Sequence, residues 1–214
     1  MLQNRVDPQG QLIRTSARGA WMGNRGLLHN EHREIVRPFR LKAWLICVLE
    51  FKGRHRTVMT PRMYTELFFL DEATAFAAGH RPCFECRREA AQHFRRCWVR
   101  GNPAYSFTET TSIDEIDAIL HSERLAPAGS FTARIGELPN GVFVLHEDKP
   151  HLVAGGSLFL WSPFGYQEAM MPPADIALSV LTPRSTVSAF GMGYVPQSSL
   201  SLSNKTNKSP DEYI

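Results

Sequence analysis

Two cysteines, Cys83 and Cys86, are separated by two residues and follow the sequence His-Arg-Pro. A Cys-x-x-Cys turn can direct two thiolates toward one metal ion, with each sulfur about 2.3 Å from a zinc ion. The neighbouring arginines favour the thiolate form, because nearby positive charge lowers the pKa of a thiol. A redox dithiol and two buried cysteines without a function are the alternatives, but the redox motif normally lies in a βαβ unit, which the surrounding pattern does not show. The spacing therefore predicts a metal site, with zinc as the metal.

A closed zinc site needs two further ligands. His80 lies three residues before Cys83 and can bend into the site. His55 lies in a Lys-Gly-Arg-His-Arg turn, and Cys47 lies in an apolar run. We expect two of these three residues to complete the site. Cys97 lies on an apolar face, where a free cysteine more often fills the core.

The elements that position these residues are short. Residues 43–51 form an apolar run rich in β-branched and aromatic side chains, which is typical of a buried strand, and residues 67–70 form a second one. Asp71 is the predicted N-cap of a helix over 72–78, which Gly79 ends. The Cys-x-x-Cys turn follows directly, so the metal site is expected between this helix and the next.

Two further helices and a strand-rich region are predicted downstream. Residues 87–100 place apolar side chains on one face and most arginines elsewhere, which indicates an amphipathic helix with a basic exposed side. Ser112 to Glu115 has the pattern of a capping box and begins a helix that ends near residue 124. From residue 130 onward the pattern favours strands, with apolar runs at 142–145, 157–161, 176–181 and 186–190.

These elements predict an α+β protein with a strand-rich N-terminal part, a central zinc knuckle with short helices, and a C-terminal small antiparallel sheet or partial barrel. We expect a zinc-binding domain over 1–126 and a β-rich part over 127–196, which could belong to the same compact domain. Residues 197–214 offer little to bury and are expected to form a disordered tail. The chain has no apolar stretch long enough to cross a bilayer and begins without an apolar signal region, so a cytoplasmic protein with no membrane partner is expected.

The net charge of +3 conceals an uneven distribution. Residues 1–100 hold 18 Lys and Arg against 9 Asp and Glu, a net +9, and residues 101–214 hold 6 against 12, a net −6. Arginines lie on both sides of the predicted metal turn in the sequence. This pattern predicts contact with the phosphates of DNA or RNA. The alternative is a basic face that complements the acidic half within the molecule. The predicted nucleic-acid-binding residues are Arg54, Arg56, Arg81, Arg87, Arg88, Arg95 and Arg96.

Residues 69–88 read Phe-Leu-Asp-Glu-Ala-Thr-Ala-Phe-Ala-Ala-Gly-His-Arg-Pro-Cys-Phe-Glu-Cys-Arg-Arg. This segment resembles the second half of the Ada-type metal-binding domain, in which four cysteines bind zinc and one thiolate takes a methyl group from a methylphosphotriester in damaged DNA. Cys83 and Cys86 match the second cysteine pair of that family, and His55 falls close to the later cysteine of the first pair. The resemblance therefore implies zinc binding and a link to DNA alkylation repair. The methyl-accepting thiolate belongs to the upstream Cys-x-x-x-Cys pair, which this chain lacks.

The overall layout is also similar to bacterial proteins described only as metal-binding. It combines a strand-rich start, the Gly-His-Arg-Pro-Cys-x-x-Cys segment, Leu-Thr-Pro at 181–183 and Gly-Tyr-x-Pro at 193–196. This similarity implies no particular reaction.

Two other functions remain open from the sequence. Zinc nucleobase deaminases carry His-x-Glu followed later by Pro-Cys-x-x-Cys, with the Glu as proton shuttle. His29-Asn-Glu31 and the Cys83 turn satisfy these letters, although the segment around His29 lacks helical periodicity. A structural zinc module with a protein partner is the second alternative.

Overall fold

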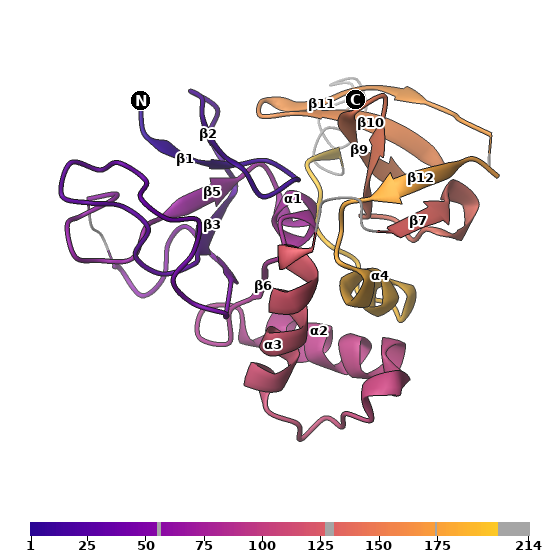
Figure 1. Ribbon diagram of the computed structural model, residues 1–214, viewed down its shortest axis with the longest axis horizontal. Coiled ribbons are helices and arrows are strands. Elements are labelled where there is room, and N and C mark those ends of the chain that lie inside the picture. Colours follow the sequence, from indigo (N-terminus) through magenta and orange to yellow (C-terminus); the bar gives the residue numbers. More distant parts are fainter. Residues whose placement is uncertain (55–56, 127–130, 174, 201–214) are drawn as a thin grey trace, which may run out of the picture.

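The computed structural model describes residues 1–54, 57–126, 131–173 and 175–200, whose strands form two sheets (Figure 1). The first sheet has six strands in the order β2-β1-β5-β3-β4-β6. Its strands are β1 (Gln3–Val6), β2 (Leu12–Arg14), β3 (Trp21–Asn24), β4 (Leu45–Cys47), β5 (Leu67–Phe69) and β6 (Arg81–Pro82). The pairs β1–β5 and β4–β6 are parallel, and the other pairs are antiparallel.

The second sheet also has six strands, in the order β11-β10-β9-β8-β12-β7. They are β7 (Phe131–Arg134), β8 (Phe143–His146), β9 (Lys149–Ala154), β10 (Ser157–Ser162), β11 (Gly165–Met170) and β12 (Ala177–Val180). Every pair is antiparallel. Because β11 and β7 are edge strands in the described part of the chain, this sheet is open and does not close into a barrel. The predicted α+β class is confirmed.

In the described ranges, four α-helices connect and cover the sheets (Figure 1). They are α1 (Glu72–Ala77), α2 (Arg88–Gly101), α3 (Ile113–Leu125) and α4 (Arg184–Gly191), with short 3₁₀ helices at Pro103–Tyr105 and Ile135–Glu137. The predicted N-cap of α1 is confirmed, since the Asp71 carboxylate accepts a hydrogen bond from the Thr74 backbone N–H at 2.8 Å. The capping box of α3 is also present, formed by Ser112 and Glu115. These helix starts follow from contacts within three residues, so the sequence alone could specify them.

One cluster of buried side chains runs from the first sheet through the helices to the second sheet. Helix α1 lies at its centre, between the two sheets, and all six of its residues are buried (Figure 1). The ring of Phe76 contacts the rings of Phe94, Phe190 and Tyr194, with centroids 5.2 Å apart in each case. Aromatic pairs at this separation add to the stabilisation that burial provides. Packing in the core therefore fixes the position of α1 and of the segment that leads from α1 to the cysteine turn.

Three local predictions need correction. Residues 186–190 were expected to continue the strand pattern, but they belong to α4, which packs against α2. A run of five residues of which three are apolar does not distinguish a strand from a buried helix, and the packing surface of α2 decides between them. Of residues 43–51 only Leu45–Cys47 form a strand, which pairs with β3 on one side and with β6 on the other.

The start of the predicted disordered tail is also ordered. The backbone N–H of Gln197 donates to Glu72 at 2.9 Å, and that of Ser199 donates to Asp71 at 3.0 Å. These two carboxylates are buried at the start of α1 and need hydrogen-bond donors, which the C-terminal segment supplies. The rest of the predicted tail, residues 201–214, lies outside the described residues.

Candidate metal centre

Cys47 and Cys83 lie next to each other because of the parallel pairing of β4 and β6. In this pairing Leu45 lies opposite Arg81 and Ile46 lies opposite Pro82. The next position on each strand is a cysteine, and the backbone N–H of Cys83 donates to the Ile46 carbonyl at 3.0 Å. Residues at matching positions of neighbouring strands lie on the same face of a sheet. Two cysteines 36 positions apart in the chain are therefore brought together by strand register.

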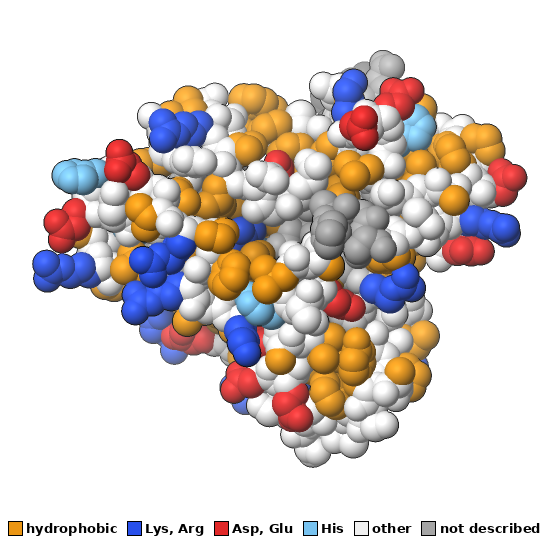
Figure 2. Space-filling view, in the orientation of Figure 1, with side chains coloured by type: hydrophobic (Ala, Val, Ile, Leu, Met, Phe, Trp, Pro, Cys, Tyr) orange, Lys and Arg blue, Asp and Glu red, His pale blue; other side chains and the backbone are white. Residues whose placement is uncertain are grey.

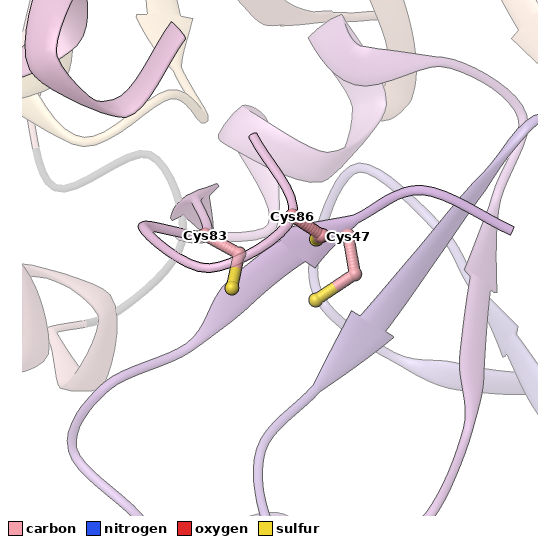
Figure 3. A group of neighbouring side chains, drawn as sticks. All are labelled: Cys47, Cys83 and Cys86. Carbon is pink, nitrogen blue, oxygen red and sulfur yellow. The ribbon is translucent and has the colours of Figure 1, made fainter. Parts of the chain in front are cut away.

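Cys86 joins them from the turn that follows β6 (Figure 3). The Sγ atoms of Cys47, Cys83 and Cys86 all lie within 4.8 Å of one another. All four cysteines of the chain are free thiols, so no disulfide occupies this position. Three thiolates on one zinc ion would have sulfur atoms about 3.8 Å apart, from the bond length of about 2.3 Å and tetrahedral angles. The three side chains therefore form a group that is compatible with a metal site and requires only small movements to close on an ion.

The position of the group between core and surface also suits a metal ligand set. Cys47 and Cys83 are buried, whereas Cys86 is partly exposed and lies directly before α2. Buried thiols on a sheet edge are held in place by the packing around them, and the partly exposed third thiol leaves a route by which an ion can enter. This combination makes the site accessible without leaving its ligands mobile.

The electrostatic environment favours one thiolate even without a metal. Hydrogen bonding from the Cys47 thiol lowers the pKa of Cys83 to about 5, aided by the backbone N–H groups of Cys86 and Glu85. The Glu85 N–H lies 3.4 Å from the Cys83 sulfur. The same pairing with Cys83, together with burial, raises the pKa of Cys47, and burial raises that of Cys86. One negative charge is therefore shared by the group, and binding of a divalent cation would release the remaining protons.

Of the two predicted histidine ligands, the structure describes His80. His80 is buried away from the cysteine group, where its Nε2 accepts a hydrogen bond from Arg25 Nε at 3.1 Å. Its ring packs against Trp44 and Phe69, with centroids 5.2 Å and 4.7 Å away. Burial lowers the pKa of His80 well below its ordinary value, so this side chain is neutral. His55 lies outside the described residues, and its role stays a prediction.

The predicted phosphate-binding arginines are divided between the interior and the surface. Arg81 is buried in a two-pronged ion pair with Asp117, at 2.7 Å and 2.5 Å. The Arg87 side chain is 9 % exposed and lies 2.7 Å from Glu72, with its guanidinium 4.0 Å from the centre of the Trp21 ring. Both charges are already compensated inside the molecule, so neither side chain is available to a phosphate in this conformation.

The remaining predicted arginines lie nearer to solvent. Arg54 pairs with Glu85 at 2.9 Å on the surface, and Arg95 donates to the carbonyl of Glu109. Arg88 and Arg96 are exposed on α2, and Arg56 lies outside the described residues. Figure 2 shows that on one face of the molecule basic side chains lie in small groups among acidic and apolar ones, without a continuous basic surface.

The constellation expected for a deaminase is not assembled among the described residues. His29 is buried and hydrogen-bonded to Thr65 and to the Thr60 carbonyl, at 2.6 Å and 3.2 Å. Glu31 is exposed and lies 3.6 Å from Arg62. Neither side chain belongs to the cysteine group. A proton shuttle acts only within hydrogen-bond reach of the metal-bound water, so this geometry does not support that role for Glu31.

Comparison of the chain with protein-family models, with curated proteins and with solved structures gave no match. The Ada-type resemblance thus stays a prediction that rests on residues 69–88 alone. In the described part of the chain, no helix has both the length and the apolar character that a membrane span requires. The cysteine group is therefore the feature of the molecule that bears most directly on function.

Proposed function

We propose that this chain is a zinc-binding protein in which Cys47, Cys83 and Cys86 supply three thiolate ligands. The observation that carries the proposal is the convergence of three free thiols from two sites distant in the sequence. The alternative, a redox-active cysteine pair, uses only two thiols. It does not account for a third thiol at the same distance, which has no part in dithiol exchange. Thiolates select soft or borderline ions, and zinc suits tetrahedral sulfur-rich sites.

The proposed ion has a structural role at the junction of two short strands and helix α2. Strand β4 has three residues and β6 has two, so their pairing contributes few backbone hydrogen bonds. Cys47 is the last residue of β4, and Cys83 directly follows β6. Cys86 lies two residues before the start of α2. A metal that links these points would fix the end of the sheet to the start of the helix. The fourth ligand position suits His55, which the sequence predicts as a ligand, or a water molecule.

Elemental analysis of protein purified without added metal should find about one zinc ion per chain. Cys47→Ser should lower the zinc content to a small fraction of that value, because a Cys-x-x-Cys turn alone retains zinc poorly. Cys97→Ser is the matched control, since Cys97 is a buried free thiol on α2 outside the group. Native protein without zinc, or equal zinc in Cys47→Ser and native protein, would contradict the proposal. His55→Ala measured in parallel tests the fourth ligand.

A second candidate function is nucleic-acid binding through the exposed side of α2. Its support is that Arg88, Arg96 and Arg100 are exposed and form no ion pair with any described residue. Duplex DNA should bind with an affinity that falls as salt rises, because phosphate contacts release counterions. Replacing Arg88 and Arg96 together by Ala should lower that affinity by about tenfold and reduce the salt dependence, as measured by fluorescence anisotropy. Unchanged binding in this double variant would place any nucleic-acid site elsewhere.

A further inference from the structure

A pocket of about 380 Å³ is lined in part by Trp44, the residue that directly precedes strand β4. Segments from both halves of the chain line it, including the N-terminal loop, the end of α1, the end of α3 and the start of α4. Its apolar walls include Phe39, Trp44, Phe131 and Leu181. A volume of this size falls within the range of small-molecule sites.

Arg25 lines this pocket and is almost completely buried, with 2 % of its surface exposed. Its Nε donates to His80 at 3.1 Å, and its Nη1 donates to the Gly10 carbonyl at 3.1 Å. Its Nη2 is buried and has no hydrogen-bond partner among the described residues. Buried polar groups are nearly always paired, so an orphaned guanidinium nitrogen needs an explanation.

Arg124 repeats this arrangement from α3. Its Nε donates to the Leu120 carbonyl at 3.0 Å and its Nη1 to the Lys42 carbonyl at 2.8 Å. Its Nη2 is also buried without a partner in the described part of the chain. The guanidinium groups of Arg25 and Arg124 lie 4.0 Å and 4.4 Å from the centre of the same Trp44 ring. The guanidinium groups of Arg25 and Arg124 thus both lie against the Trp44 indole. In each of them Nε and Nη1 are hydrogen-bonded to the protein, whereas Nη2 is not hydrogen-bonded to any described residue.

No described carboxylate forms an ion pair with either arginine. The neighbouring acids have other partners. Glu123 accepts hydrogen bonds from the backbone and side chain of Ser185, Asp117 pairs with Arg81, and Asp7 accepts from the Gln11 N–H. Burial lowers the pKa of Arg25 to about 9, and repulsion from Arg124 adds to the effect. Burial likewise lowers the pKa of Arg124 to about 9, so both remain charged at neutral pH.

We propose that this pocket binds a small organic anion whose carboxylate or phosphate group pairs with the guanidinium groups of Arg25 and Arg124, after a small side-chain movement that turns their unpaired Nη2 atoms toward the ligand. A guanidinium matches the geometry of both oxyanions and is the side chain best suited to hold them. Asp7, Asp117 and Glu123 are near enough to act on these cations, but none of these carboxylates is in direct ion-pair contact with them, and a bound anion would supply that contact. The proposed site is separate from the cysteine group and does not depend on a bound metal.

The walls of the pocket define the rest of the ligand. The volume exceeds that of a bare oxyanion, and aromatic and aliphatic side chains form much of the lining. An apolar or aromatic body attached to the anionic group would fill this space and exclude water from the ion contacts. Arg184 lies at the start of α4 with its guanidinium 4.1 Å from the centre of the Phe131 ring, and adds a further positive charge to the pocket wall.

The test uses phenyl phosphate, benzoate, inorganic phosphate and the neutral benzyl alcohol, each added to the native protein at constant ionic strength. Phenyl phosphate or benzoate should raise the thermal midpoint and titrate calorimetrically with a Kd of about 1 mM or tighter. Benzyl alcohol should not bind, since it lacks the charge. The stronger of the two aromatic anions identifies the preferred oxyanion, and inorganic phosphate reports how much the apolar body contributes.

Arg124→Gln should weaken binding of the preferred anion by about tenfold or more, the effect of losing a charged hydrogen bond. Arg96→Gln is the matched control, because Arg96 is exposed on α2 outside the pocket, and it should bind like the native protein. Equal affinity in Arg124→Gln and native protein would overturn the proposal. Failure of both aromatic anions to bind native protein at about 10 mM would also overturn it, whatever the folding of the variants.

Discussion

Removal of zinc by a strong chelator should lower the thermal midpoint of the native protein by about 10 °C. A ligand present at about 1,000 times its Kd stabilises the folded state by about 4 kcal/mol. For a chain of this size, 1 kcal/mol corresponds to about 2–4 °C. The effect should be large here because β4 and β6 are short and the proposed zinc ion would join their ends to the start of α2. Differential scanning calorimetry with and without chelator measures the shift.

The control for chelation is the Cys47→Ser variant. Because this variant should hold little zinc, chelator should leave its midpoint nearly unchanged, and that midpoint should lie close to the chelated native value. Adding zinc back to the chelated native protein should restore the original midpoint. A native midpoint that does not respond to chelator, in protein shown to have lost its zinc, would contradict a structural role for the ion. Zinc binding itself would remain supported by the metal content.

Asp117→Ala is expected to lower the free energy of unfolding by about 3–5 kcal/mol, the usual cost of leaving one partner of a buried ion pair without the other. The side chains of Arg81 and Asp117 are 5 % and 2 % exposed, so water cannot replace the missing carboxylate. Arg81 also lies on β6, two residues before Cys83, and the pair fixes β6 to α3. The variant should therefore bind zinc more weakly as well. Urea denaturation and zinc titration measure the two effects.

Asp114→Ala is the matched control because Asp114 is exposed on the same helix, and its loss should cost at most about 1 kcal/mol through the helix dipole. Combining Arg81→Met with Asp117→Leu should recover most of the lost stability, since a buried ion pair can often be replaced by apolar side chains. If Asp117→Ala is no less stable than Asp114→Ala, the ion pair does not support β6 in the way described.

The sequence predicted best those features that depend on neighbouring residues. Asp71 bonds to the N–H three positions later, and the capping box of α3 spans four residues, so both helix starts could be placed. Gly79 has a φ of +80°, and a Cβ there would approach the Arg124 side chain to 3.0 Å, which accounts for a glycine at the end of α1. The Cys-x-x-Cys turn belongs to the same class of local features.

The predictions that failed concern residues whose contacts are made with segments distant in the sequence. The sequence offered His80 as a ligand because it is near Cys83 in the chain, yet the structure places it beside Arg25, 55 positions away. It treated Arg81 as a surface cation, although the buried carboxylate of Asp117 lies 36 positions away. Nothing in the local sequence of Arg25 and Arg124 indicates that both guanidinium groups lie against Trp44.

By itself, then, the sequence determined an α+β chain with local helix caps and a cysteine pair suited to a metal, because these depend on residue type and short spacing. Only the tertiary structure decided which third thiol joins the pair, which arginines are compensated inside the molecule, and which two remain without partners in a pocket. The physical reason is that ligand sets and ion pairs form through space. Strand register and helix packing set those distances, and neither is encoded within any single segment.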